Sequence, residues 1–104
     1  MINFLKKLFS GNKAELQNKI KEGAFLVDVR SASEYHSGHV PGSVNIPVDT
    51  IANNLQKFQN KKSILVFCAS GMRSGVAKSI LQKNNIPNVI NAGTWSKVNK
   101  LIGA

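Results

Sequence analysis

The sequence has little of several features that define particular classes of protein. It contains one cysteine, Cys68, so no disulfide can form within the chain, and a reducing, cytoplasmic setting is expected. Its longest apolar run covers residues 64–69, far short of the ~20 residues that cross a bilayer as a helix. With 42% hydrophobic and 18% charged residues, the chain has the composition of a globular domain.

Acidic residues are scarce, and so is arginine. The chain has 14 Lys and Arg residues and 5 Asp and Glu residues, which gives a formal net charge of +9. Only Arg30 and Arg73 are arginines. Proteins that read nucleic-acid sequence rely on arginine, whereas the lysines here are scattered. We therefore interpret them as a solvated surface and expect no nucleic-acid partner. A basic surface would still attract small anions or an acidic partner protein.

A length of 104 residues fits one domain. We divide it into a basic N-terminal segment, residues 1–12, and a domain over residues 13–104. Ile2, Leu5 and Phe9 have helical spacing, which predicts a short helix packed on the domain. The alternative is a light attachment to an acidic membrane surface, without stable insertion.

Segments of strand type alternate with segments of helical type along the domain. Strands are predicted at residues 25–29, 44–46, 63–67 and 88–91, and helices at 13–22, 31–37, 49–59, 74–84 and 94–102. The run at 63–67 has no polar alternation, which is typical of a central strand with both faces buried. The pattern predicts an open α/β sheet, mostly parallel, with ligands at the carboxyl ends of its strands.

The chemistry is expected where the strand at 63–67 ends. Cys68 comes first, and the loop and helix start that follow are Ala69, Ser70, Gly71, Met72, Arg73 and Ser74. Small residues let backbone amides turn toward one centre beside a helix N-terminus, which makes an anion site, and Arg73 adds a fixed positive charge. The same surroundings favour the thiolate and so lower the pKa of Cys68. The alternative is a buried structural cysteine, which would not need such a loop.

Four motifs together resemble the rhodanese-like sulfurtransferases in their single-domain form. The order and spacing agree over about residues 13–104, and the motifs are LVDVR at 26–30, Glu34-Tyr35, GHVPGSVNIP at 38–47 and CASGMRS at 68–74. The fold class expected from pattern and resemblance is α/β, an open, mostly parallel five-stranded sheet with helices on both faces.

The resemblance implies sulfur transfer. Cys68 would attack the outer sulfur of a small anionic donor such as thiosulfate, sulfite would leave, and a thiol or cyanide acceptor would take the sulfur from the Cys68 persulfide. Amides of the loop would hold the persulfide and Arg73 the anionic end of the donor, with no metal or cofactor. The stretch between Cys68 and Arg73 is one residue shorter than in cysteine-dependent phosphatases, which argues against phosphatase or arsenate reductase activity.

Four further residues are interpreted as structural support. We expect Asp28 to anchor nearby backbone, Arg30 to pair with Glu34, and His39 to hydrogen-bond the turn that follows it. A metal site at His39 is not expected, because too few other ligands lie near it in sequence.

The aromatic residues Tyr35 and Trp95 are expected in the core or the pocket wall. Met72 is either a specificity element or an exposed filler.

Two other functions remain open beside an active sulfurtransferase. The domain could be a persulfide carrier that delivers sulfur to a docked partner protein, or a cysteine-based redox or anion sensor without turnover. Loading with sulfur separates the sensor from the other two, and turnover with cyanide separates the enzyme from the carrier.

Overall fold

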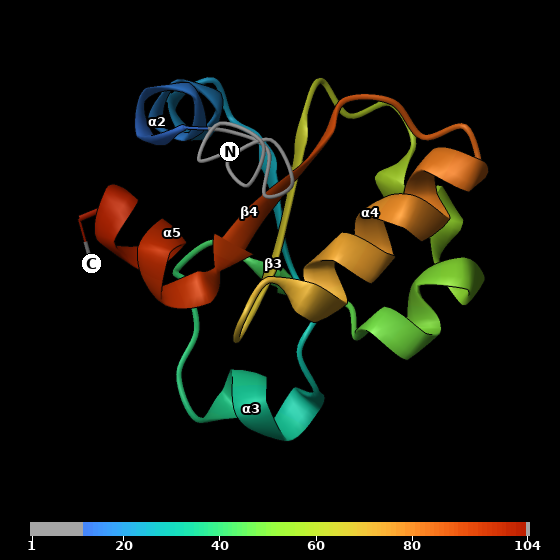
Figure 1. Ribbon diagram of the computed structural model, residues 1–104, viewed down its shortest axis with the longest axis horizontal. Coiled ribbons are helices and arrows are strands. Elements are labelled where there is room, and N and C mark those ends of the chain that lie inside the picture. The colour runs from blue at the N-terminus through green and yellow to red at the C-terminus, as the bar shows by residue number, and fades with distance from the viewer. Residues whose placement is uncertain (1–11, 104) are drawn as a thin grey trace, which may run out of the picture.

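The computed structural model describes residues 12–103, which form one α/β unit around a parallel sheet (Figure 1). Within these residues the sheet has four strands in the order β2-β1-β3-β4, all parallel. The strands are β1 (Phe25–Asp28), β2 (Val44–Asn45), β3 (Ile64–Cys68) and β4 (Val89–Thr94). The expected fifth strand is therefore absent from the described chain, which agrees with the four apolar runs that the sequence contains.

Strand β3 lies inside the sheet and divides the core into two layers. Ile64, Val66 and Cys68 point into one buried cluster, and Leu65 and Phe67 point into the other. All five residues are buried, because successive side chains of a strand point to opposite faces and both faces are covered. The apolar run was therefore a reliable sign of a central strand.

Different helices cover the two faces of the sheet. The helices are α2 (Lys13–Lys21), α3 (Ala32–His36), α4 (Met72–Lys83) and α5 (Trp95–Leu101). Helices α2 and α5 lie on one side, α4 lies on the other, and α3 lies beyond the end of the sheet (Figure 1). The Asn12 side chain accepts a hydrogen bond from the Glu15 amide and so caps α2, and a Ser31–Glu34 capping box begins α3.

The prediction of one α-helix at residues 49–59 is wrong in the type of helix. The chain instead forms two 3-10 helices, η1 (Val48–Asn53) and η2 (Leu55–Phe58). Asn54 interrupts them with φ −129°, and its side-chain amide donates to the Thr50 carbonyl. Ile51 and Phe58 are nevertheless buried, so the apolar stripe identified the inward face but not the winding of the backbone.

The carboxyl ends of β1, β3 and β4 meet next to α3 and the start of α4. Asp28 pairs in register with Phe67, and a bulge in the β3–β4 ladder moves the register from Val66↔Asn91 to Phe67↔Gly93. Residues 1–11, with the predicted amphipathic segment, lie outside the described residues. Of the helices between residues 12 and 103, none is long and apolar enough to span a bilayer.

Candidate active site at the end of strand β3

The loop after β3 reverses within a few residues. Cys68 ends the strand, and Gly71, with φ 96°, leads directly into α4, which begins at Met72. The left-handed conformation of Gly71 is easily adopted only without a Cβ atom. The helix therefore begins two residues before the predicted start and places its first free amides nearer to Cys68.

Backbone and side-chain groups of this turn converge on the sulfur. The Gly71 amide donates to Cys68 Sγ at 3.0 Å, and the Ser74 amide donates at 3.4 Å. The Ser74 hydroxyl lies 3.5 Å from the same sulfur. Of the loop residues named from the sequence, Gly71 and Ser74 thus direct their amides at the sulfur.

These donors set the charge state of the thiol. Burial is the largest single influence and raises the pKa of Cys68, because it disfavours the thiolate. Hydrogen bonds from the Ser74 hydroxyl and from the amides of Ser74, Ser70 and Gly71 together outweigh burial, so the pKa lies below its usual value. This is the direction expected from the sequence.

Cys68 is nevertheless completely covered, with 0% relative exposure. The reactivity expected from the sequence requires a thiol that a donor can reach, and the structure covers it. The physical reason is the direction of the side chain, which points into the cluster beneath α4 while the amides of the turn close over the sulfur. A donor therefore reaches Sγ only when the turn or its surroundings move.

Asn91, a residue that sequence reasoning missed, holds the turn from strand β4. Its side-chain oxygen accepts from the Ser74 hydroxyl at 2.7 Å and from the Gly93 amide at 3.0 Å. Its side-chain amide donates to the Gly71 carbonyl at 3.1 Å. Asn91 lies next to the bulge in the β3–β4 ladder, and no local motif would have indicated its contacts.

Arg73 is engaged by a carboxylate. Its Nη1 and Nη2 atoms donate to the two carboxylate oxygens of Glu34 at 2.7 and 3.0 Å. The hydrogen bond to Glu34 is the largest influence that raises the pKa of Arg73, and the charges of Glu34, Cys68 and Asp28 raise it further. The charges of Arg73 and Cys68 thus influence each other, and the charge of Arg73 is neutralised by Glu34 of α3.

Arg30 pairs with Asp28 and not with Glu34, so the predicted Arg30–Glu34 pair is wrong. The buried Arg30 donates from Nε and Nη2 to the Asp28 carboxylate and from Nη2 to the Gly38 carbonyl at 2.7 Å. Its guanidinium lies 4.5 Å from the centre of the Trp95 ring. The backbone anchoring predicted for Asp28 is present, because its carboxylate accepts from the Arg30 amide.

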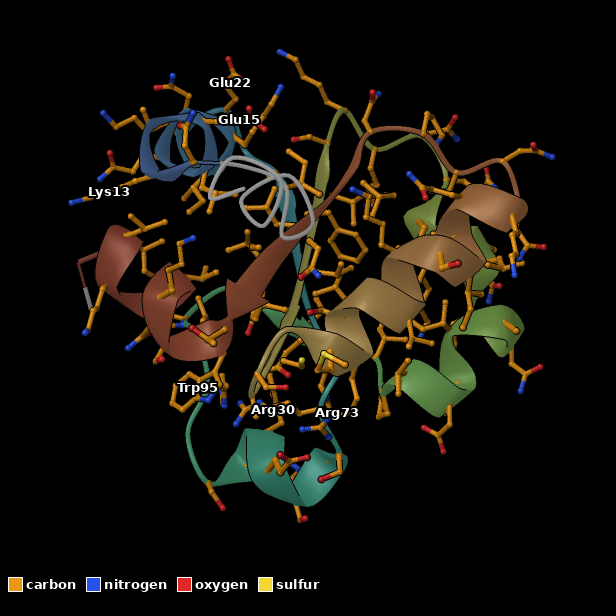
Figure 2. The ribbon with its side chains drawn as sticks, viewed as in Figure 1. Lys13, Glu15, Glu22, Arg30, Arg73 and Trp95 are labelled. Carbon is orange, nitrogen blue, oxygen red and sulfur yellow. The ribbon has the colours of Figure 1, made fainter. Side chains whose placement is uncertain are left out.

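Figure 2 shows both arginines between the carboxyl end of the sheet and α3, with Trp95 at the start of α5. The two carboxylates bind different arginines. Arg30 follows the strand directly and folds back on Asp28, whereas Glu34 lies one helical turn further along and binds Arg73 on α4. Sequence spacing alone did not distinguish the two pairings.

The remaining predicted residues lie around the turn. Ala69 and Ser70 are exposed, and Met72 is 71% exposed, so the Met72 side chain is not part of the core. His39 Nδ1 lies 2.8 Å from the Tyr35 carbonyl and its ring stacks on that of Tyr35, so it holds the end of α3 and not the turn after it.

No group of three or more His, Cys, Asp or Glu side chains is gathered as metal ligands would be in residues 12–103. The chemical groups that converge here are a thiol with a lowered pKa, amide donors and a carboxylate-bound guanidinium. Such an arrangement can hold an anionic sulfur at the end of β3.

The chain is similar to known proteins over most of its length. Residues 12–100 match the family model of the rhodanese-like domain. A rhodanese-like domain protein from Staphylococcus aureus has 32% sequence identity and a TM-score of 0.71, with 84% of this chain and 86% of that chain covered.

Two curated proteins illustrate the range of relatives. The chain is 35% identical to Thiosulfate sulfurtransferase PspE of Escherichia coli, covering 64% of this chain and 66% of that protein. It is 33% identical to Putative sulfur carrier protein YrkF of Bacillus subtilis, covering 67% of this chain but 38% of that protein. The chain spans about half or less of the length of several such relatives.

Proposed function

The chain belongs to the rhodanese-like domain family, and we propose that it is a sulfurtransferase that carries sulfane sulfur as a persulfide on Cys68. The observation that carries this proposal is the convergence of the Gly71 and Ser74 amides on Cys68 Sγ. Donors that stabilise a thiolate also stabilise the terminal sulfur of a persulfide, which is an anion as well.

The reaction consists of two displacements. The Cys68 thiolate attacks the outer sulfur of thiosulfate, the S–S bond of the donor breaks, and sulfite leaves with the bonding electron pair. A cyanide or thiolate acceptor then attacks the outer sulfur of the Cys68 persulfide and releases the Cys68 thiolate. Because the thiolate exists beforehand, no separate general base is needed, and ping-pong kinetics are expected.

The site residues have separate roles in this proposal. Cys68 is the nucleophile, and the turn formed by Ala69, Ser70, Gly71, Met72, Arg73 and Ser74 surrounds the transferred sulfur. Asp28, Arg30, Glu34 and His39 hold the elements on which the turn rests. The buried Asp28–Arg30 pair, with its bond to Gly38, fixes the segment before β2 against the end of β1.

Mass spectrometry of the intact protein tests the proposal. Incubation with thiosulfate or methanethiosulfonate should add one sulfur atom to the wild-type chain and none to Cys68→Ser, and cyanide should remove it as thiocyanate. If Cys68 gains no sulfur from either donor, the proposal is contradicted, and a cysteine-based sensor is the alternative that remains.

A persulfide carrier is the second candidate, and the face of α4 next to the turn favours it. Met72 and Val76, one helical turn apart, are 71% and 54% exposed on a chain of net charge +9. An acidic partner with an apolar contact would suit this surface. Loading of Cys68 without turnover by cyanide would support the carrier.

A further inference from the structure

A recess adjoins Arg73 between the start of α3 and the start of η1. It has a volume of about 310 Å³, close to the lower end of the range for small-molecule pockets of roughly 300–1,000 Å³. Its apolar lining comes from Val29, Ala32, Pro47 and Val48. A recess of this size and lining suits an organic group better than a small, strongly hydrated ion.

The charges at the recess are unfavourable for a doubly charged anion. Arg73 and Asp49 both line it, and Glu34 binds Arg73 through both carboxylate oxygens. Among the described residues that line the recess or bind Arg73, one cation thus faces two carboxylates. The only other arginine of the chain, Arg30, is buried against Asp28. Neither arginine offers an uncompensated charge to a donor.

The Arg73–Glu34 pair persists at any ordinary pH. The hydrogen bond from Arg73 is the largest influence that lowers the pKa of Glu34 to about 2, and the Ser31 amide lowers it further. Both side chains are more than a third exposed, so the pair is screened by water and a competing anion can displace Glu34. Repulsion from the displaced carboxylate grows in proportion to the charge of that anion.

Given the persulfide chemistry proposed above, we infer that the recess beside Arg73 binds the organic part of a singly charged or neutral sulfane-sulfur donor, and that Glu34 selects against inorganic dianions such as thiosulfate. Glu34 is a specificity-determining residue that acts through Arg73. With an organic thiosulfonate, the Cys68 thiolate takes the outer sulfur, the S–S bond breaks, and the sulfinate leaves with the electron pair, so charge and atoms balance.

Three donors separate charge from shape. Thiosulfate is a dianion, methanethiosulfonate replaces one anionic oxygen with a methyl group, and benzenethiosulfonate keeps the single charge and adds an apolar body. The measurement is kcat/KM for each donor with cyanide as acceptor, at fixed ionic strength. We expect kcat/KM to rise at least tenfold from thiosulfate to methanethiosulfonate and to rise again for benzenethiosulfonate.

Three variants test whether the effect of donor charge comes from Glu34 and whether the effect of donor shape comes from the recess. Glu34→Gln preserves the capping box and should raise kcat/KM for thiosulfate about tenfold, while the value for methanethiosulfonate changes less than about threefold. Glu22→Gln removes the same charge from the far end of the molecule and should change neither value (Figure 2). Ala32→Leu, an exposed position of the lining, should lower kcat/KM for benzenethiosulfonate only.

Other values of kcat/KM contradict either the inference about the recess or the proposed function. Wild-type kcat/KM for thiosulfate at or above that for the thiosulfonates would overturn the inference, as would a donor preference that Glu34→Gln leaves unchanged. Cys68 that accepts sulfur from none of the three donors would instead refute the proposed function, so the two failures are distinguishable.

Discussion

The Ser74 hydroxyl has one hydrogen and lies between two acceptors. It donates to Asn91 Oδ1 at 2.7 Å, and it lies 3.5 Å from Cys68 Sγ. Asn91 Oδ1 also accepts from the Gly93 amide, so it keeps a partner if the hydroxyl turns toward a thiolate. This residue can therefore adjust its hydrogen bond to the charge on the sulfur without leaving a buried group unsatisfied.

Ser74→Ala removes that adjustable donor. The pKa of Cys68 should rise, because a hydrogen bond to the thiolate is lost while burial remains. Stability is affected little, but the rate of alkylation at pH 7 should fall by up to about tenfold, the equivalent of ~1.4 kcal/mol, and its pH profile should move to higher pH. Ser79→Ala, an exposed position on the same helix, is the control. An unmoved pH profile would contradict this role of the hydroxyl.

The Asp28–Arg30 pair is almost fully buried, with side chains 0% and 5% exposed. Arg30→Met would leave the Asp28 carboxylate charged and without its partner, and should reduce the free energy of unfolding by roughly 3–5 kcal/mol. Chemical denaturation measures this loss.

The double variant Asp28→Asn/Arg30→Met should recover part of that stability, because the unpaired charge is gone. A single variant that loses less than about 1 kcal/mol would show that the pair does not hold the end of β1.

At the scale of the elements, the decisive feature is the join between β3 and α4. Gly71 adopts φ 96° there, and the turn delivers two amides to Cys68. Gly71→Ala should cost about 1–3 kcal/mol of stability and should also lower the rate of persulfide formation, because the amides shift away from Sγ.

Gly23→Ala is a matched control, since Gly23 has φ 87°, an added Cβ meets nothing within 4 Å, and the residue follows α2. It should lose similar stability while the persulfide forms at the wild-type rate. Equal losses of rate in both variants would indicate a general effect of destabilisation.

The sequence predicted most elements because their patterns are local. The boundaries of α2 and β3 fell within one residue of the predicted ones, since a glycine or a change of polarity marks each end. The segment at 49–59 was predicted less well. Ile51 and Phe58 showed which side faces the core, but 3-10 and α winding can present the same apolar positions, and the packing against α4 decides between them.

For the whole molecule, the net charge of +9 acts over a longer range than the Arg73–Glu34 pair. It concentrates anions near the surface, while the pair selects among them at the site. The KM for thiosulfate should therefore rise as salt increases from about 0.05 to 0.5 M, because the Debye length falls below ~10 Å.

The rise should be smaller for methanethiosulfonate, which carries one charge fewer. A KM that does not depend on salt would show that the basic surface does not steer donors.

The sequence by itself determined the α/β class, the central buried strand and the position of Cys68 at its carboxyl end, because strand periodicity, apolar runs and small-residue loops are properties of neighbouring residues. The tertiary structure decided which carboxylate binds which arginine, that Cys68 is covered, and that Asn91 holds the turn. Glu34 and Arg73 are 39 positions apart, and Asn91 is 20 positions from Gly71. Contacts over such separations depend on how strands and helices pack, which no local pattern encodes.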